Sequence, residues 1–163
     1  MFRMKRAIWI VAISILLVGC SRWAYKVPTV AMEPTIKPGD TVWVDHGYYT
    51  SHPVERFDMV LYKASDKGDP HQGEDTKIVK RVIGLGGEKV EIREGRVFIN
   101  DQELRQTFEW IPLKESFGPI TIPREEYFLL GDNRANSFDS RYWNPPTLKS
   151  PGITGKVVEI KHN

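Results

Sequence analysis

The sequence predicts an all-β, mostly antiparallel domain that follows an N-terminal apolar helix. After Lys26, no stretch repeats its apolar residues with the 3.6-residue period of a helix, whereas short runs of β-forming residues recur between turn signals. The 13 glycines and 11 prolines, slightly above average usage, also favour strands and turns over a helix bundle. A chain of 163 residues is long enough for one domain with its own core.

The N-terminal segment, residues 1–25, is predicted to be a membrane anchor or a signal segment. Three basic residues precede an uncharged, mostly apolar run of 15 residues, 7–21. As a helix this run rises about 22 Å at ~1.5 Å per residue, less than the ~30 Å of a bilayer core, and Trp23 and Tyr25 would extend it into the headgroup region. The basic cluster predicts that the following domain, residues 26–163, lies outside the cytoplasm.

A lipid anchor is the alternative to an uncleaved transmembrane anchor. Leu17-Val18-Gly19-Cys20 resembles the lipobox of bacterial lipoproteins, in which the cysteine becomes the lipidated first residue of the mature chain. Either anchor makes membrane lipid a partner of the protein. Cys20 is the single cysteine, which excludes an intrachain disulfide and a zinc site built from cysteines.

The first predicted strands of the body follow turn residues. Residues 41–44 (Thr-Val-Trp-Val) come after Pro-Gly-Asp at 38–40, and residues 59–62 (Met-Val-Leu-Tyr) come after Arg-Phe-Asp at 56–58. The next stretch, Ala64–Thr76, is polar and without periodicity, which predicts an exposed loop.

The later predicted strands include a hairpin. Residues 77–83 form an apolar run that ends at a glycine-rich turn, 84–87. Residues 90–93 and 96–100 flank Glu94-Gly95, which predicts two antiparallel strands joined by a tight turn. The last two predicted strands are 127–130 and 156–160.

Charge and histidine spacing exclude several classes of function. Residues 1–26 hold five basic residues and no acid, so the rest of the chain has 18 basic and 21 acidic residues, a net charge of −3. An acidic body has no electrostatic reason to bind nucleic acid. The four histidines have neither metal-ligand spacing nor a serine partner in a motif, so we predict no metal site, no cofactor and no Ser-His-Asp triad.

Three segments carry candidate chemistry. They are residues 25–40, which contain Ala-Met-Glu-Pro-Thr and end in Gly-Asp, residues 78–84 (Ile-Val-Lys-Arg-Val-Ile-Gly), and residues 131–141 (Gly-Asp-Asn-Arg-Ala-Asn-Ser-Phe-Asp-Ser-Arg). In this order, behind an apolar N-terminal segment, they resemble the signal peptidase I family of membrane-bound serine endopeptidases. Arg-Phe-Asp-Met-Val at 56–60 resembles a further, weaker element of the family.

The resemblance implies a fold, a reaction and a location. The fold is a partly open, barrel-like β structure with a cleft in which an extended peptide docks by strand addition. The reaction is the removal of signal peptides from exported preproteins, after small residues at P1 and P3, by a Ser/Lys dyad that needs no cofactor. The location is the bacterial cytoplasmic membrane, with a single-pass anchor and the body on the extracytoplasmic side.

Lys80 is the candidate general base of this dyad. A lysine accepts a proton only when it is neutral, so its usual pKa of about 10.4 must fall, and burial among apolar groups lowers it. Ile78 and Val82 would share the strand face of Lys80, but Arg81 has equally apolar neighbours on the opposite face. The resemblance assigns the role to Lys80, and an arginine does not deprotonate in proteins.

Ala31 occupies the position at which the family has its nucleophilic serine. Thr29 matches the family position whose hydroxyl helps to stabilise the oxyanion, and it lies about 6–7 Å from residue 31 along an extended chain. The sequence therefore predicts lost or residual activity. Three interpretations remain open: a peptidase with a displaced hydroxyl, a non-catalytic peptide-binding or accessory homologue, and an active enzyme altered by design.

The remaining matched positions imply supporting roles. Ser137 matches the serine that orients the lysine amine, and Asp139 and Arg141 match a charge pair that shapes the third segment. Residue 135 is alanine where many members carry aspartate. The other positions that match family motifs are Met32, Pro34, Thr35, Gly39, Asp40, Arg81, Gly131, Asp132, Asn133 and Arg134.

Overall fold

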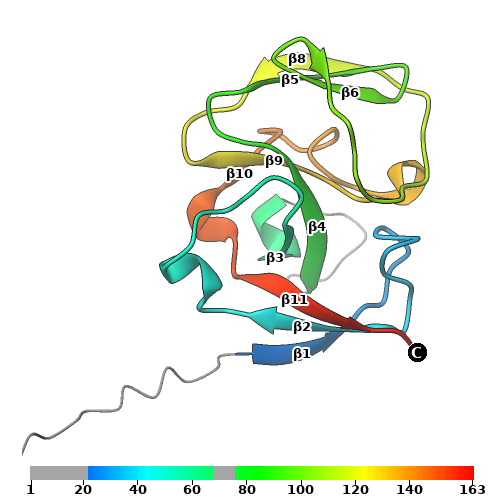
Figure 1. The fold of residues 1–163 in the computed structure, drawn as a ribbon, viewed down its shortest axis with the longest axis vertical. Coiled ribbons are helices and arrows are strands. Elements are labelled where there is room, and N and C mark those ends of the chain that lie inside the picture. Colours follow the sequence, from blue (N-terminus) through cyan, green and yellow to red (C-terminus); the bar gives the residue numbers. More distant parts are fainter. Residues whose placement is uncertain (1–21, 68–75) are drawn as a thin grey trace, which may run out of the picture.

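The computed structural model describes residues 22–67 and 76–163 as two β-sheets (Figure 1). The larger sheet has the strand order β1 (Arg22–Lys26), β2 (Thr41–Asp45), β11 (Gly155–Lys161), β3 (Met59–Lys63), β4 (Lys77–Gly84), β9 (Glu126–Leu130), β10 (Leu148–Lys149). The smaller sheet has the order β7 (Gln102–Glu103), β6 (Arg96–Ile99), β5 (Lys89–Arg93), β8 (Phe117–Thr121). Short 3-10 helices are η1 (Tyr48–Thr50), η2 (Ala64–Lys67), η3 (Arg134–Asn136) and η4 (Ser150–Gly152).

The expected all-β architecture is confirmed. Every strand pair in the two sheets is antiparallel, and the sheets form an open rather than a closed barrel. All seven predicted strands are present, with ends that differ by one or two residues. The predicted hairpin joins β5 to β6, with Arg93 paired with Arg96 and positive φ angles of 49° at Glu94 and 83° at Gly95.

The structure differs from the prediction at the start of the domain. Residues 22–26 pair with β2 along their whole length, so Trp23 and Tyr25 belong to a strand of the domain and not to the predicted N-terminal segment. Ala64–Lys67, the start of the predicted loop, forms η2. The predicted N-terminal helix, Cys20 and residues 68–75 lie outside the described residues. In the parts of the chain that the structure describes, no helix is long and apolar enough to cross a membrane.

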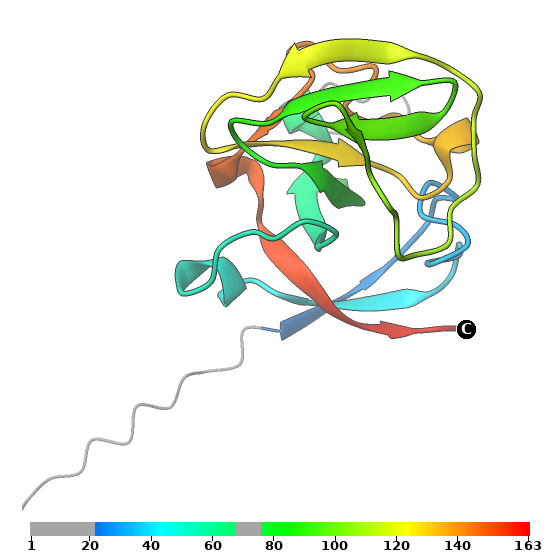
Figure 2. The same cartoon turned by 45° about the horizontal axis from the view of Figure 1, so that its top comes forward.

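Strand β4 links the two ends of the molecule (Figures 1 and 2). The smaller sheet lies at one end, the β1-β2-β11 layer lies at the other, and β4 runs between them. Val79 packs in the apolar cluster under β2 and β11, Val82 packs in the cluster that contains Trp143, and Ile83 packs in the cluster under the smaller sheet. Residues 78–84 are all buried, so β4 places its charged residues inside the protein.

Candidate functional site

One pocket of about 520 Å³ unites residues that the sequence singled out in three separate segments. Ala31 and Thr29 reach it from the segment between β1 and β2, Lys80 from β4, and Ser137 from the end of η3. The pocket is lined by Thr29, Val30, Ala31, Ile78, Lys80, Ala135, Asn136, Ser137, Phe138 and Tyr142. The chain therefore folds so that a primary amine and the side chain of residue 31 face a common space.

Strand geometry separates the two cations of β4. Lys80 pairs with Val60 of β3 and is only 2% exposed, and both Lys80 and Ile78 line the pocket. Since successive residues of a strand point to opposite faces, Arg81 lies on the other side of β4. The ambiguity between these residues is thus resolved by which face of the strand meets the pocket.

The backbone at residue 31 is held by the turn after β9. The Asn133 main-chain N–H donates to the carbonyl oxygen of Ala31 at 3.1 Å, and the Asn133 side-chain amide donates to the carbonyl oxygen of Val30 at 3.2 Å. The methyl group of Ala31 lines the pocket, so residue 31 offers no hydroxyl to a substrate. Thr29 is half-buried and lines the same pocket.

Gly131 sits where no side chain fits. A Cβ atom at this position would lie 2.2 Å from Ser137 Oγ and 2.4 Å from the carbonyl oxygen of Ala31. Ser137 Oγ is buried, and among the residues that the structure describes it has no hydrogen-bond partner. The hydrogen bond to the Lys80 amine that the resemblance implies is therefore not made in this structure, although both side chains line the pocket.

A buried ion pair attaches the third motif segment to β4. Arg81 donates from Nε to Asp132 Oδ1 at 2.8 Å and from Nη2 to Asp132 Oδ2 at 2.6 Å, and Thr35 Oγ1 donates to the same Oδ2 at 2.5 Å. The bidentate geometry fixes the guanidinium as well as neutralising it. Residues from all three motif segments meet at Asp132, next to the residue that holds Ala31.

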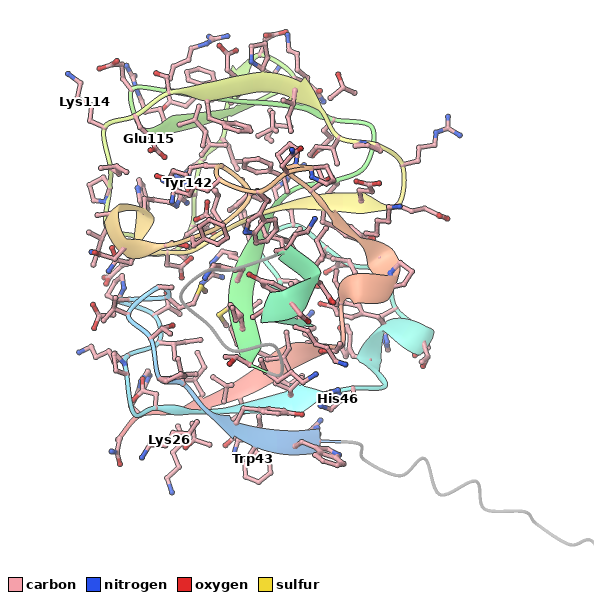
Figure 3. The ribbon with its side chains drawn as sticks, turned by 180° about the vertical axis from the view of Figure 1, so that it is seen from behind. Lys26, Trp43, His46, Lys114, Glu115 and Tyr142 are labelled. Atoms are coloured by element: carbon pink, nitrogen blue, oxygen red, sulfur yellow. The ribbon has the colours of Figure 1, made fainter. Side chains whose placement is uncertain are left out.

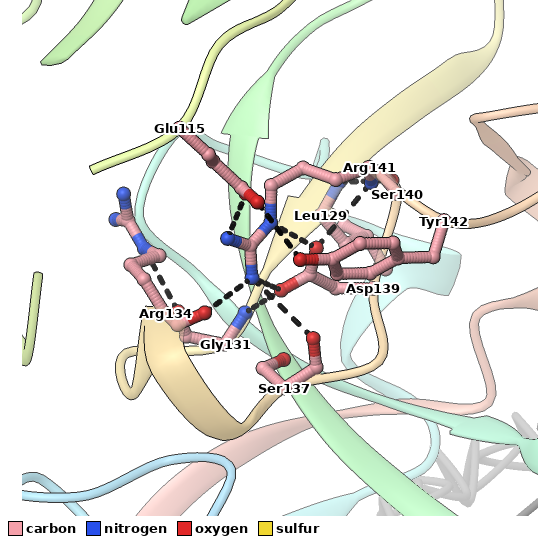
Figure 4. Close-up of polar contacts among 9 residues, drawn as sticks. All are labelled: Glu115, Leu129, Gly131, Arg134, Ser137, Asp139, Ser140, Arg141 and Tyr142. Carbon is pink, nitrogen blue, oxygen red and sulfur yellow. Dashed lines mark hydrogen bonds and ion pairs between the residues drawn. The ribbon is translucent and has the colours of Figure 1, made fainter. Parts of the chain in front are cut away.

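Arg141 organises the loop that carries Ser137 (Figure 4). It donates from Nε to Asp139 Oδ1 at 2.8 Å and from Nη2 to the carbonyl oxygen of Arg134 at 2.9 Å, so the expected Asp139–Arg141 pair is present. Asp139 Oδ2 also accepts from the main-chain N–H of Gly131 at 3.0 Å. Burial opposes the charge of Arg141, but the hydrogen bonds and charge of Asp139 raise its pKa above the usual value. Burial lowers the pKa of Arg134 to about 10, which leaves it protonated at neutral pH.

The first motif segment is fixed at its far end by Asp40. Gly39 adopts a positive φ of 92°, which lets the chain turn into β2. Asp40 accepts hydrogen bonds from the main-chain N–H of Lys37 at 2.9 Å, from His162 at 2.8 Å and from the N–H of Asn163 at 3.0 Å, and these contacts lower its pKa to about 2. Of the other motif residues, Met32 packs in the core and Pro34 lies at the surface in a shallow depression beside Phe108 and Trp110.

Sequence reasoning missed two residues that line the pocket, Phe138 and Tyr142, and a third, Glu115, that contacts Tyr142. Tyr142 donates from its hydroxyl to Glu115 Oε2 at 2.9 Å (Figures 3 and 4). Burial, followed by this hydrogen bond, raises the pKa of Tyr142. Phe138 lies between the motif residues Ser137 and Asp139, and Tyr142 follows Arg141, so their place in the sequence could have indicated that they lie near the site. Glu115 comes from the segment before β8, and nothing local connects it to the motif.

A second, much smaller pocket adjoins the first. Its volume is about 20 Å³, and it shares Thr29 and Ile78 with the larger pocket. Buried apolar side chains form much of its wall, including Met32 and Leu61. Since a single water needs about 10–15 Å³, this space accommodates a group the size of a methyl.

Comparison with known proteins identifies relatives along the chain. The signal peptidase, peptidase S26 family matches residues 2–161. "Probable signal peptidase I-2" of Synechocystis is 33% identical over 120 residues, which are 74% of this chain and 55% of the relative. "Signal peptidase I V" of Bacillus subtilis is 30% identical over 179 aligned positions, which cover 97% of this chain and all of the relative. "Thylakoidal processing peptidase 1, chloroplastic" of Arabidopsis thaliana is 32% identical, and the match covers 94% of this chain and 46% of the relative.

A solved structure supports the same relationship. The crystal structure of a signal peptidase I from Enterococcus faecalis V583 superposes with a TM-score of 0.51 at 26% identity and covers 66% of this chain and 98% of that chain. The chain spans about half the length of some of the relatives that it matches, and the full length of others. With nearly every residue matched and the three motif segments gathered around one pocket, the chain belongs to the signal peptidase family, peptidase S26.

Proposed function

We propose that this protein is a signal peptidase I-like protein whose Ser/Lys-type endopeptidase site serves the removal of signal peptides from exported preproteins, with the nucleophile of that site replaced by Ala31. The observation that carries the proposal is the buried Lys80 side chain, which lines the same pocket as the methyl group of Ala31. Lys80 is the amine that this pocket offers as a base for a hydroxyl at residue 31. With no hydroxyl at residue 31, the expected activity is lost or residual.

A hydroxyl at residue 31 would complete the site. Lys80 Nζ would take the proton of the serine hydroxyl as its Oγ bonds to the scissile carbonyl carbon. Lys80 would then give that proton to the leaving amine as the C–N bond breaks, and water would hydrolyse the resulting ester. Thr29, at the edge of the pocket, would donate a hydrogen bond to the oxyanion.

Neither neighbouring hydroxyl is a good replacement for the absent serine. Ser137 lines the pocket, but its Oγ is buried against the turn at Gly131, where a Cβ atom would lie 2.2 Å from it, so this oxygen is less open to a substrate carbonyl carbon than a side chain that projects into the pocket. Thr29 lies two residues from the vacant position, about 6–7 Å along an extended chain, whereas attack requires about 3–3.5 Å. This argues against a peptidase with a displaced hydroxyl. The second candidate function is therefore a non-catalytic peptide-binding or accessory homologue, favoured by an intact pocket without a nucleophile.

The substrate class follows from the shape of the site. An extended peptide that docks by strand addition presents alternate side chains to the protein. The 20 Å³ pocket accepts only small side chains such as alanine beside the position of bond cleavage. We therefore expect saturable binding of an Ala-x-Ala peptide, and a flat titration would contradict the proposal.

The proposed location is the bacterial cytoplasmic membrane, with a single-pass anchor in residues 1–25 and the body on the extracytoplasmic side. Three basic residues before the apolar run support this orientation. A lipid anchor at Cys20 is the alternative. Intact mass spectrometry of membrane-extracted protein separates them, because lipidation predicts a diacylglyceryl adduct and the loss of residues 1–19, whereas a transmembrane anchor predicts an unmodified full chain.

Restoring the hydroxyl tests the proposed site directly. We expect Ala31→Ser to raise cleavage of a small-residue signal peptide in detergent by about 10³-fold or more over the parent chain, because nucleophile losses in serine proteases cost at least this much. The matched control is Ala31→Ser with Lys80→Met, which should return to the blank rate. A folded, peptide-binding Ala31→Ser protein without turnover would refute the proposed dyad.

A further inference from the structure

Phe138 and Tyr142 form an aromatic wall on the larger pocket. Their rings are stacked, with centroids 6.1 Å apart and an interplanar angle of 14°. Tyr142 is 49% exposed and is therefore accessible to a ligand in the pocket, while Phe138 is half-buried and packs against the core.

This wall is held rigidly in place. The Tyr142 hydroxyl donates to Glu115 Oε2 at 2.9 Å, and the guanidinium carbon of Arg141 lies 5.1 Å from the centre of the Tyr142 ring (Figure 4). Arg141 is in turn tied to Asp139 and Glu115. An exposed ring that is already fixed loses little conformational entropy when a ligand packs on it, so it contributes more to affinity than a free one.

The two pockets give the bound peptide a direction. Both contain Thr29 and Ile78, but Ala31, Lys80 and the aromatic wall belong to the larger pocket alone. The small side chains that precede the cleaved bond would occupy the 20 Å³ pocket. The cleaved peptide bond would then lie in the larger pocket, next to Ala31 and Lys80. The chain that follows the bond then continues toward Phe138 and Tyr142.

We propose that the aromatic wall of Phe138 and Tyr142 is a specificity site for the residues after the cleaved bond and selects apolar, above all aromatic, side chains there. The inference rests on the proposed function, because it assumes that a small-residue peptide occupies the neighbouring pocket. A space of about 520 Å³ accepts a large side chain, and stacked or edge-on ring contacts are the geometry that the wall offers.

The test uses the full chain with Ala31 present, so that binding is measured without cleavage. Two fluorescent peptides share an Ala-x-Ala sequence and differ only in the next two residues, which are Phe-Phe or Ser-Ser. We expect the Phe-Phe peptide to bind about fivefold more tightly, since an aromatic pair contributes about 0.5–1.5 kcal/mol beyond its buried area. In Tyr142→Ala the two peptides should bind about equally, whereas Tyr142→Phe keeps the ring and should keep most of the preference.

Trp43→Ala is the matched control. Trp43 is 37% exposed on β2, outside both pockets, and Figure 3 shows it at the lower end of the molecule, well away from Tyr142. The fivefold ratio should be unchanged in this variant. Equal binding of both peptides to the parent chain, or a ratio that survives Tyr142→Ala, would overturn this inference alone. No binding of either peptide would instead overturn the proposed function, and this inference with it.

Discussion

Removing the charge of Asp132 should destabilise the protein far more than removing a surface charge. The side chains of Arg81 and Asp132 are 7% and 1% exposed, and two hydrogen bonds join them. In Asp132→Asn the buried guanidinium keeps its charge and loses its counter-ion, which costs about 3–5 kcal/mol. At about 2–4 °C per kcal/mol for a domain of this size, Tm should fall by about 6–20 °C.

Urea denaturation measures the free energy of unfolding and thermal denaturation measures Tm. The control is an exposed ion pair on the same protein. Lys114 and Glu94 form an ion pair with 80% and 62% exposed side chains, so Glu94→Gln should change the free energy of unfolding by less than about 1 kcal/mol. A double variant, Asp132→Asn with Arg81→Met, leaves no stranded charge and should cost less than the sum of its single changes. If Asp132→Asn costs no more than Glu94→Gln, the reasoning about burial is wrong.

Two further predictions concern Gly131, which adjoins the pocket residue Ser137, and Asp40, at the far end of the first motif segment. Gly131→Ala places a methyl group 2.2 Å from Ser137 Oγ, so it should cost about 1–3 kcal/mol and weaken Ala-x-Ala peptide binding, as measured by urea denaturation and titration. Unchanged peptide affinity in Gly131→Ala would contradict the prediction that displacing Ser137 alters the pocket. Asp40, whose pKa is lowered to about 2, stabilises the fold above its unfolded value near ~3.9, and this contribution is lost as pH falls through about 2. The Tm difference between the parent chain and Asp40→Asn should therefore shrink from pH 5 to pH 2, and a constant difference would contradict the assignment.

Some of the predicted strands, such as β2 and β5, alternate in burial, whereas β3, β4 and β9 contain three or more consecutive buried residues. In β2, Val42 and Val44 are buried while Trp43 is exposed, which is the two-residue period that the prediction uses. The sequence did not predict β1 as a strand, because β1 is an edge strand with no buried residue and its sequence therefore has no apolar alternation. The sequence did not predict β8 either, because Gly118 and Pro119 lie inside this strand and both residue types normally indicate a turn.

The candidate site was predictable in its residues but not in its arrangement. Resemblance to the family motifs pointed to residues 31, 80 and 137, and all three line one pocket. Periodicity did not distinguish Lys80 from Arg81, because both faces of β4 are buried and each cation has apolar neighbours. Glu115 was not predictable at all, since its contact with Tyr142 joins residues 27 positions apart in the chain.

The opposite orientation of Lys80 and Arg81 on β4 makes the site sensitive to the length of this strand. Inserting or deleting one residue ahead of residue 80 would reverse which side chains point to which face. A guanidinium, which does not give up its proton, would then occupy the pocket, and an amine with no bidentate geometry would face Asp132. Substitutions in β4 therefore leave the orientation of its side chains unchanged. An insertion or deletion of an odd number of residues would remove Lys80 from the pocket and also break the ion pair between Arg81 and Asp132.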